Sequence, residues 1–522
     1  MDSNKYTPLI VFFLVALGMF LERYITIKTT NDNFMFVNNN NKILEVVNAI
    51  ENKYVEKIST DSLAEEIIPK LLEKLDPHST YIPAKDIEQA EERLNGKING
   101  GIGIEYNFYH DTLIVMYVLK NSPAAESGII AGDRIIKIDT NTIYPATKMT
   151  KKIPTLIRGD INTYVNLSIK RSGCDSLMIK KIKRNKIPLP SVETAFNIND
   201  SIRYIKITSF GSNTYKEFCE QTVDSINKFS TLIIDLRDNG GGYLQAVIKI
   251  ANEILPHKAM IVYTQNREGR KREFYADSKN RLKDKKIIIL VDSWSASASE
   301  ILAGAIQDND RGIIVGRRTF GKGLVQTTID LNDGSQLRLT TERYYTPTGR
   351  CIQKPYGTGV NYNDDIKNRL LNGELDSAIK NTFPDSLKFT TPKGKTVYGG
   401  GGIMPDIFVP ESENKLSEYI LKCNRQNLFK KFSALHFNAE TAKYNNNAVT
   451  SIFDDNLLYN KFINFTIANG VKPQKEEDID NQYINNQIKA AIKLIINDET
   501  NCYKLIQNYD NDLKTALSTL EQ

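Results

Sequence analysis

The chain has 522 residues, of which 41% are hydrophobic and 25% charged, an ordinary globular composition with room for two to four domains. A net charge of +6 is too dilute over this length to predict nucleic-acid binding. The five cysteines are odd in number and form no CxxC pair, so the sequence predicts neither a zinc site nor a disulfide framework, and we expect no metal or other cofactor.

An uncharged apolar run, residues 8–21, lies close to the N-terminus. Its length is short for a membrane-spanning helix and typical of the apolar part of a signal peptide. Because no clear small-residue cleavage site follows, the sequence favours an uncleaved membrane anchor within residues 1–30, and a cleaved signal peptide is the alternative. Both interpretations predict an exported protein, either in the bacterial inner membrane facing the periplasm or free in the periplasm.

Residues 42–96 are predicted to form a helical region after a polar linker. Apolar residues recur at helical spacing from Ile43 to Tyr54 and again from Leu63 to Leu75. Pro77 ends the second of these helices, and a charged third helix is expected before residue 96.

Short β-rich runs then extend over residues 97–185 and resemble a PDZ domain. The resemblance implies that backbone N–H groups at Gly101, Ile102, Gly103 and Ile104 bind the C-terminal carboxylate of a peptide, whose backbone pairs with the adjacent strand edge. The two isoleucines suggest a pocket for an apolar terminal side chain. The alternative is that these glycines only form a tight turn.

An α/β core is predicted over residues 186–411. A buried strand at Leu232–Arg237 leads into a glycine turn and a helix, and a second strand at Ile287–Val291 leads into a serine-rich turn and another helix. Repeated strand–turn–helix units of this kind predict a parallel sheet. We expect a helix over about Thr214–Phe229, a polar loop over residues 360–385, a last core segment at Val397–Ile407 and a helix-rich region over residues 412–522.

A serine and a lysine each follow a predicted core strand. Ser297 lies between a strand and a helix start, where unpaired N–H groups can stabilise a negative oxygen. Lys322 follows the strand Gly312–Gly316 and lies 25 residues after Ser297. A serine nucleophile needs a base, and a lysine can act as one only when its pKa falls several units below about 10.4. Its apolar neighbours Phe320, Leu324 and Val325 are of the kind that lower a pKa by burial.

Six sequence blocks together resemble the carboxyl-terminal processing (tail-specific) serine peptidases. In chain order these blocks are Leu75–Thr80, Gly101–Ile104, Asp235–Gly242, Ser295–Glu300, Arg318–Gln326 and Gly402–Ile407. The resemblance implies a crotonase/ClpP-like α/β core with an inserted PDZ domain. It also implies a serine endopeptidase that captures the C-terminal tails of proteins or peptides and cleaves upstream. A homo-oligomer is compatible with this assignment.

The same resemblance implies residue roles. Ser297 is the expected nucleophile, Lys322 the general base, and Gln326 a hydrogen-bonding partner that orients the lysine. The neighbouring Ser295 and Ser299 are interpreted as a turn residue and a helix cap.

An oxyanion hole is implied beside the serine. Its donors would be the N–H of Ala298 and a glycine N–H from the 240–242 turn, Gly242 in the first place and Gly241 in the second. Asp235 and Arg237, which precede this turn, are interpreted as a structural ion pair or as residues that hold the glycine turn, and not as catalytic groups.

Arg158 has two interpretations, as a residue that couples the PDZ domain to the core and as an exposed arginine at a helix end. A Ser–His–Asp triad would require one of His78, His110, His257 or His436, and all four lie in unfavourable contexts. His78, in particular, is expected in the N-terminal helical region. The stretch Gly316–Gly323 follows a strand like a phosphate-binding loop, but it has glycine where serine or threonine would hold magnesium.

Two other functions compete with proteolysis. A catalytically silent PDZ scaffold would not need the intact set of serine, lysine and glutamine. An acyl-CoA enzyme of the crotonase type would share the two backbone donors but would not need the PDZ insertion or the export signal.

Overall fold

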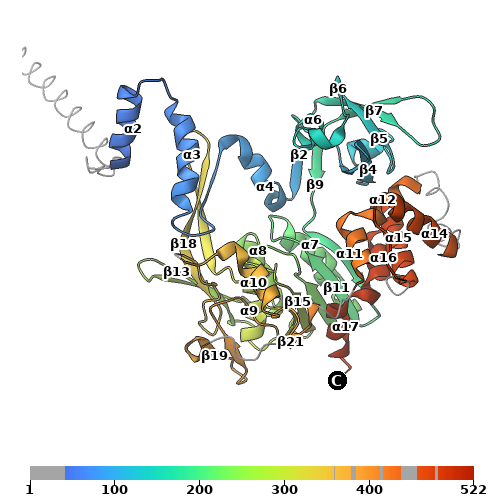
Figure 1. Cartoon of the computed structure of the whole chain (residues 1–522). Helices are drawn as coiled ribbons and strands as arrows, with labels where there is room; N and C mark the ends of the chain where they lie inside the picture. Colours follow the sequence, from blue (N-terminus) through green and yellow to red (C-terminus); the bar gives the residue numbers. More distant parts are fainter. Residues whose placement is uncertain are drawn as a thin grey trace, which may run out of the picture. The chain divides into compact units, whose positions relative to one another are not determined.

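A computed structural model describes residues 42–357, 359–377, 384–411, 416–436, 455–475 and 480–521 (Figure 1). The chain divides into two compact units, Met1–Lys74 and Leu75–Gln522. The predicted signal peptide or anchor lies outside the described residues. Over the described ranges no helix is both long and apolar enough to cross a membrane.

The first unit contains the two predicted N-terminal helices, α2 (Lys42–Lys53) and α3 (Thr60–Leu72). The hydroxyl of Ser59 caps α3 by accepting a hydrogen bond from the N–H of Ser62 at 3.3 Å. Such a cap satisfies one of the N–H groups that the first turn leaves without a partner.

The second unit begins with a short strand and a helix and continues into a small β domain. Its strands form one sheet in the order β3-β4-β5-β7-β8, with β6 paired to β5. The strands are β3 (Ile104–Tyr109), β4 (Thr112–Val118), β5 (Arg134–Ile138), β6 (Asn141–Thr142), β7 (Tyr164–Lys170) and β8 (Met178–Lys183). The helix α4 (Ile87–Asn95) precedes this domain. The domain itself contains α5 (Pro123–Glu126), α6 (Ile153–Ile157) and a 3₁₀-helix at Ala146–Met149.

The two ends of this domain are joined by one strand pair. β2 (Lys97–Gly101) runs antiparallel to β9 (Asn185–Pro188), so the chain enters and leaves the domain at the same place. Inside the domain, alternate residues of β7 are fully buried, which is the period-two pattern of a strand with one face on a core.

The core sheet has six strands in the order β10-β11-β12-β15-β16-β21. They are β10 (Val192–Asn197), β11 (Ile202–Ile207), β12 (Thr231–Asp235), β15 (Lys286–Val291), β16 (Ile313–Gly316) and β21 (Ile407–Phe408). Only β10 pairs antiparallel to its neighbour, and the other strands run parallel. β12 is buried along its whole length because helices cover both faces of the sheet.

Different parts of the chain supply the helices on the two faces. One face packs against α7 (Thr214–Gln221), α8 (Leu244–Ile254) and α9 (Ala298–Asp308), with Ile289 of β15 in that cluster. The neighbouring Ile288 and Leu290 belong to a separate cluster with α17 (Asn511–Ser518), whose red ribbon lies beside these strands in Figure 1. The second layer of the core therefore comes from the C-terminal region.

A second sheet holds the segment that follows Lys322. Its order is β1-β18-β13-β14, and β17 also pairs with β18. The strands are β1 (Thr80–Ile82), β13 (Met260–Asn266), β14 (Lys271–Tyr275), β17 (Leu324–Asp330) and β18 (Gln336–Tyr345). Because β1 pairs with β18, the chain just after Pro77 is tied to the sheet that carries Gln326.

Three local predictions differ from the structure. The α-helix that begins at Thr214 ends at Gln221, and a 3₁₀-helix continues to Lys228. The polar segment predicted as a loop contains α10 (Asp365–Leu371), where the buried Arg369 pairs with Asp365 one turn earlier. In the last predicted core segment, β20 (Thr396–Tyr398) pairs with β19 (Lys388–Thr390), so only β21 joins the core sheet.

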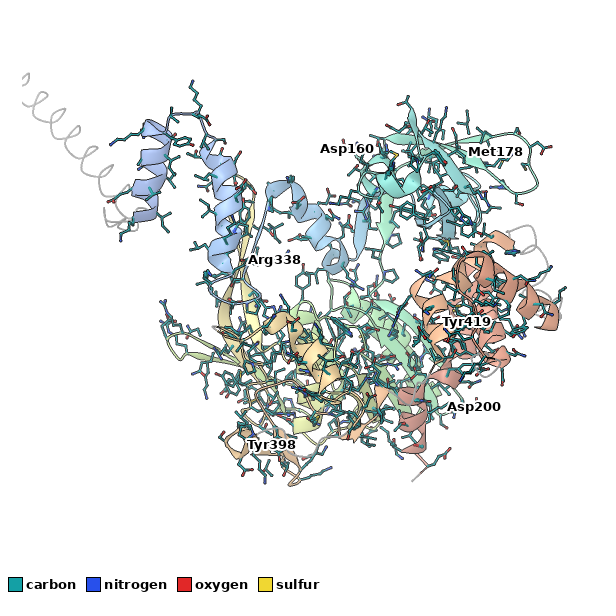
Figure 2. The ribbon with its side chains drawn as sticks, in the orientation of Figure 1. Asp160, Met178, Asp200, Arg338, Tyr398 and Tyr419 are labelled. Carbon is teal, nitrogen blue, oxygen red and sulfur yellow. The ribbon has the colours of Figure 1, made fainter. Side chains whose placement is uncertain are left out.

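The C-terminal region has a hydrophobic core of its own. Its helices are α11 (Glu418–Arg425), α12 (Leu428–His436), α14 (Asp455–Ala468), α15 (Asn481–Ile495), α16 (Glu499–Ile506) and α17. Phe432 and Phe462 are fully buried between them, and Tyr419 packs in the same cluster (Figure 2).

Candidate active site

Ser297 occupies a strained turn between β15 and α9. Its backbone has φ +56° and ψ −112°, a conformation that residues other than glycine rarely adopt. Strain of this kind persists only where surrounding contacts impose it, and it is common at functional sites. The turn makes Ser297 the N-cap residue of α9 and leaves its side chain half-buried.

The two neighbouring serines have structural roles. The hydroxyl of Ser295 donates to the carbonyl of Leu236, and that of Ser299 donates to the carbonyl of Asn239, both at 2.8 Å. The prediction that Ser299 caps the helix is wrong, because α9 begins one residue after Ser297. Both hydroxyls tie the serine turn to the segment that follows β12.

The glycine turn presses against the serine turn. Gly241 has φ +100°, and a Cβ atom at this position would lie 2.7 Å from the Cβ of Ser297 and 2.9 Å from the nitrogen of Ala298. The N–H of Gly241 donates to the side chain of Asn239 at 2.9 Å. Over the described parts of the chain, the N–H groups of Ala298 and Gly242 have no acceptor. The N–H of Gly241, by contrast, is already used by the side chain of Asn239.

Lys322 lies next to the same turn. The hydroxyl of Tyr344 donates to the carbonyl of Ser297 at 3.2 Å and to the carbonyl of Lys322, so one buried phenol contacts both backbones. Burial lowers the pKa of the Lys322 amine below its usual value, although the negative charges of Glu300 and Asp76 oppose the shift. This is the change that a lysine base requires.

Glu300 joins the two segments from within the core, and it is a site residue that sequence reasoning did not single out. Its carboxylate is fully buried and accepts four hydrogen bonds. The donors are the N–H of Ser297 at 2.8 Å, the N–H of Lys322 at 2.9 Å, the N–H of Gly321 at 2.7 Å and the hydroxyl of Thr319 at 2.6 Å. Burial raises the pKa of Glu300 even though these bonds stabilise the carboxylate.

Gln326 lies on β17, and its side chain is directed to β18 rather than to the lysine. Its Nε2 donates to the hydroxyl of Thr340 at 3.1 Å, and that hydroxyl donates to Asp76 at 3.1 Å. Within the described residues, no hydrogen bond joins the side chain of Lys322 to that of Ser297 or Gln326.

The segment Asp76–Ser79 also reaches the site, contrary to the expectation for His78. The buried Asp76 accepts from the N–H groups of His78 and Ser79 and from the Ser79 hydroxyl. Burial and the nearby charge of Lys322 lower the pKa of His78 to about 4. Its Nε2 lies 2.7 Å from the hydroxyl of Tyr362. The three-residue spacing of Asp76 and Ser79 was a possible sequence signal of this turn. The pairing of β1 with β18 is what places the segment at the active site.

The PDZ-like domain contains a cavity of about 390 Å³ at the predicted peptide site. All four predicted residues, Gly101–Ile104, contribute to its lining, together with Tyr106 and Arg158. Arg158 forms an ion pair at 2.8 Å with Glu92 of α4. It therefore links the end of α6 to the helix that precedes the domain.

The chain resembles known peptidases over much of its length. Peptidase family S41 matches residues 201–366, and the PDZ domain family matches residues 100–180. A carboxy-terminal-processing protease of Bartonella bacilliformis is 34% identical over 360 residues, 67% of this chain and 81% of that protein. The carboxy-terminal processing protease CtpB of Bacillus subtilis is 32% identical over 317 residues, 60% of this chain and 65% of that protein. A solved photosystem II D1 C-terminal processing protease is 23% identical, with a TM-score of 0.36 over 70% of this chain and 92% of that chain. The chain belongs to peptidase family S41, the family of carboxy-terminal processing serine proteases, and carries a PDZ domain.

Proposed function

We propose that Ser297 is the nucleophile and Lys322 the general base with which this serine endopeptidase hydrolyses peptide bonds. The observation that carries the proposal is that the segments of Ser297 and Lys322 share two hydrogen-bonding partners. Glu300 accepts from both N–H groups, and the Tyr344 hydroxyl donates to both carbonyls.

The neutral Lys322 amine takes the proton of the Ser297 hydroxyl while the serine oxygen attacks the peptide carbonyl. The N–H groups of Ala298 and Gly242 donate to the oxygen that becomes negative, and each such donor is worth roughly 3–4 kcal/mol of barrier. The lysine ammonium then gives its proton to the departing amine. A water molecule, activated by the same lysine, hydrolyses the acyl-enzyme and regenerates the serine.

The dyad side chains must approach each other when substrate binds, because they share no hydrogen bond here. Catalytic hydrogen bonds often tighten only in the complex with substrate. The side chain of Gln326 donates to Thr340 here, so it would have to break that bond to reach the lysine.

We further propose that the PDZ cavity binds the free C-terminal tail of a protein substrate, which is cleaved upstream. Its glycine-rich edge and its apolar lining support a terminal carboxylate with an apolar side chain. Peptides with a free C-terminus should bind at least tenfold more tightly than their C-terminal amides, and equal affinities would refute carboxylate recognition.

The core is further proposed to be of the crotonase/ClpP type. Support comes from the parallel β12-β15-β16 arrangement, with a glycine turn after one strand and the serine turn after the next. We also propose export with an N-terminal anchor, on the basis of the uncharged run at residues 8–21. Fractionation of cells that express the whole chain or residues 31–522 would test this, because only the former should sediment with membranes.

The decisive experiment compares wild type, Ser297→Ala and Lys322→Ala on an unfolded protein with an apolar C-terminus. Both variants should lose cleavage by at least 10³-fold and still bind the tail. Ser335→Ala, which removes another buried serine hydroxyl, one that donates to Asp333, is the matched control and should cut like wild type. Cleavage by Ser297→Ala would refute the nucleophile, and tail binding without any cleavage by wild type would favour the scaffold function.

A further inference from the structure

The C-terminal helix α17 meets the core where two strands end. Its Leu513 and Ala516 pack on the face of the sheet formed by Ile233, Ile288 and Leu290. This docking directs the start of the helix toward the ends of β12 and β16, and two aspartates occupy that start.

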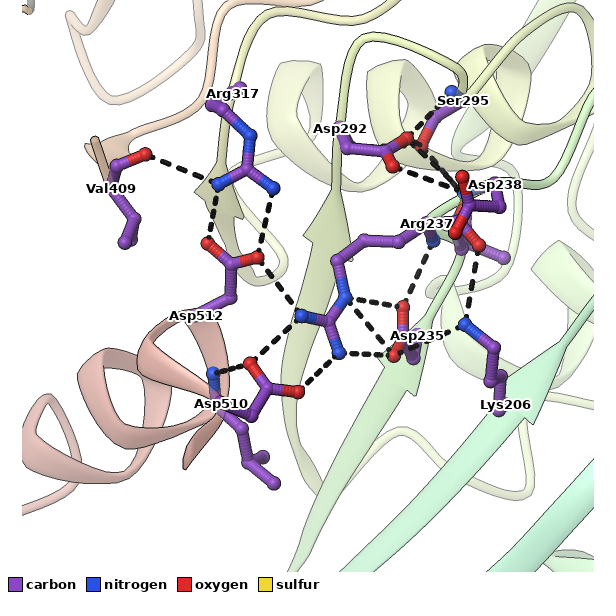
Figure 3. Close-up of polar contacts among 12 residues, drawn as sticks. Lys206, Asp235, Arg237, Asp238, Asp292, Ser295, Arg317, Val409, Asp510 and Asp512 are labelled. Atoms are coloured by element: carbon purple, nitrogen blue, oxygen red, sulfur yellow. Dashed lines mark hydrogen bonds and ion pairs between the residues drawn. The ribbon is translucent and has the colours of Figure 1, made fainter. Parts of the chain in front are cut away.

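Asp510 and Asp512 bind the arginines that leave these strands (Figure 3). Arg237 donates to Asp510 at 2.8 and 2.6 Å and to Asp512 at 2.9 Å. Its remaining N–H groups donate to Asp235, so all five donors of the guanidinium are used. Arg317 forms a two-pronged pair with Asp512 at 2.9 and 3.0 Å.

The cluster is largely buried. Asp235 and Asp512 are at most 1% exposed and Arg317 is 8% exposed, whereas the side chains of Arg237 and Asp510 are 15% and 22% exposed. Lys206 lies 3.7 Å from Asp235, so three cations face three carboxylates. Removal of one charge from such a cluster leaves its partner buried without compensation, which is strongly unfavourable. The arginines would then have to move toward water.

Movement of Arg237 or Arg317 would displace active-site residues, because each arginine lies only a few residues before them in the chain. Arg237 lies between Leu236 and Asn239, whose carbonyls accept from the hydroxyls of Ser295 and Ser299 in the serine turn. Arg317 stands before Thr319–Lys322, the segment that Glu300 holds. Asp512 contacts both arginines, so it spans the two halves of the site.

On this basis we propose that Asp510 and Asp512 are positioning residues for catalysis. Through them the C-terminal region holds the glycine turn, residues 238–242, and the segment Thr319–Lys322 in their positions at the active site. The two aspartates touch neither substrate nor reacting atoms and act through Arg237 and Arg317. The inference rests on the proposed function of Ser297 and Lys322.

The test uses the full chain with Asp510→Asn and Asp512→Asn. Asparagine remains a good N-cap, so Asp510→Asn removes the charge while retaining the cap that Leu513 uses. Each variant should lower kcat at least tenfold and change KM less than twofold, because the tail-binding cavity is untouched. Hydrogen–deuterium exchange should accelerate in segments 236–243 and 317–323.

The matched control is Asp498→Asn. Asp498 caps the neighbouring α16 and pairs with Lys493 at 3.3 Å, remote from both strand ends. Asp498→Asn should lower the melting temperature about as much as Asp510→Asn and Asp512→Asn do, and it should leave kcat within twofold of wild type.

Wild-type kcat and wild-type exchange in both Asp510→Asn and Asp512→Asn would overturn the inference, and so would an equal loss of kcat in Asp498→Asn. If Asp512→Asn does not fold, Asp510→Asn decides alone. If the wild type cleaves nothing, the proposed function fails, and the exchange measurement still decides whether the aspartates hold these segments.

Discussion

Glu300→Gln is the substitution that most directly tests how the serine and lysine segments are held together. The change keeps the side-chain shape but replaces one of two accepting oxygens with an NH₂ group. One oxygen accepts from the N–H groups of Ser297 and Lys322, and the other from the Thr319 hydroxyl and the Gly321 N–H.

Either orientation of the glutamine leaves two buried donors without an acceptor. With NH₂ toward Thr319, these donors are the Gly321 N–H and the Thr319 hydroxyl, which already accepts from the N–H of Ile403. In the opposite orientation they are the N–H groups of Ser297 and Lys322. A buried donor without a partner costs about 1–3 kcal/mol, so we expect a loss of stability of about 2–6 kcal/mol. Because displacement of a catalytic group by 1 Å can cost about 100-fold, kcat should fall roughly 10- to 100-fold.

The assay measures kcat, KM and the melting temperature of Glu300→Gln beside Glu253→Gln. Glu253 is also fully buried and bonded, to Tyr215 and Arg281, but it contacts neither segment. Both variants should lose stability, and only Glu300→Gln should lose kcat. A Glu300→Gln enzyme with wild-type kcat would refute the view that this carboxylate holds the site together.

Three further predictions follow from the site. First, kcat/KM should rise with pH, with an apparent pKa below the value of about 10.4 for free lysine, because burial favours the neutral form of Lys322 that acts as base; an acidic limb that disappears in His78→Gln would instead assign the base to His78. Second, Gly241→Ala should lower kcat more than 100-fold while tail binding persists, since its Cβ would lie 2.7 Å from that of Ser297, and circular dichroism would verify folding; near-normal kcat would contradict the packed turn. Third, the pKa of His78 is lowered to about 4 in the folded state, against about 6.5 when unfolded. The unfolded chain therefore binds more protons between these values, and stability falls as the pH drops from 6.5 to 4, by at most ~3 kcal/mol and less for the partial exposure of the ring. Denaturant titrations of His78→Gln should show a weaker fall, and an unchanged pH dependence would exclude the effect.

The proposed nucleophile and base could be singled out from the sequence because local patterns and the family resemblance indicate the same two residues. Ser297 and Lys322 each follow a short apolar strand, and the glycines beside Asn239 indicate a backbone that approaches something closely. Such patterns depend on residues a few positions apart, and the surrounding blocks supplied the family.

Other parts of the site could not be derived in this way. Glu300 is recognisable only as a helical residue until α9 buries it against the segment before β17. Asp76 and Thr340 are 264 residues apart, and His78 could be assigned to the site only after β1 had paired with β18.

The family, the strand-and-helix units of the core and the proposed nucleophile and base can be predicted from the amino-acid order, because they depend on residues close together along the chain. What holds them in place becomes visible only in the folded protein. Arg237 donates hydrogen bonds to Asp510 and Asp512, which lie 273 and 275 residues later in the chain. The helix α17 covers the second face of the core sheet. Contacts over such separations arise from the packing of complementary surfaces, which no periodicity within one segment records.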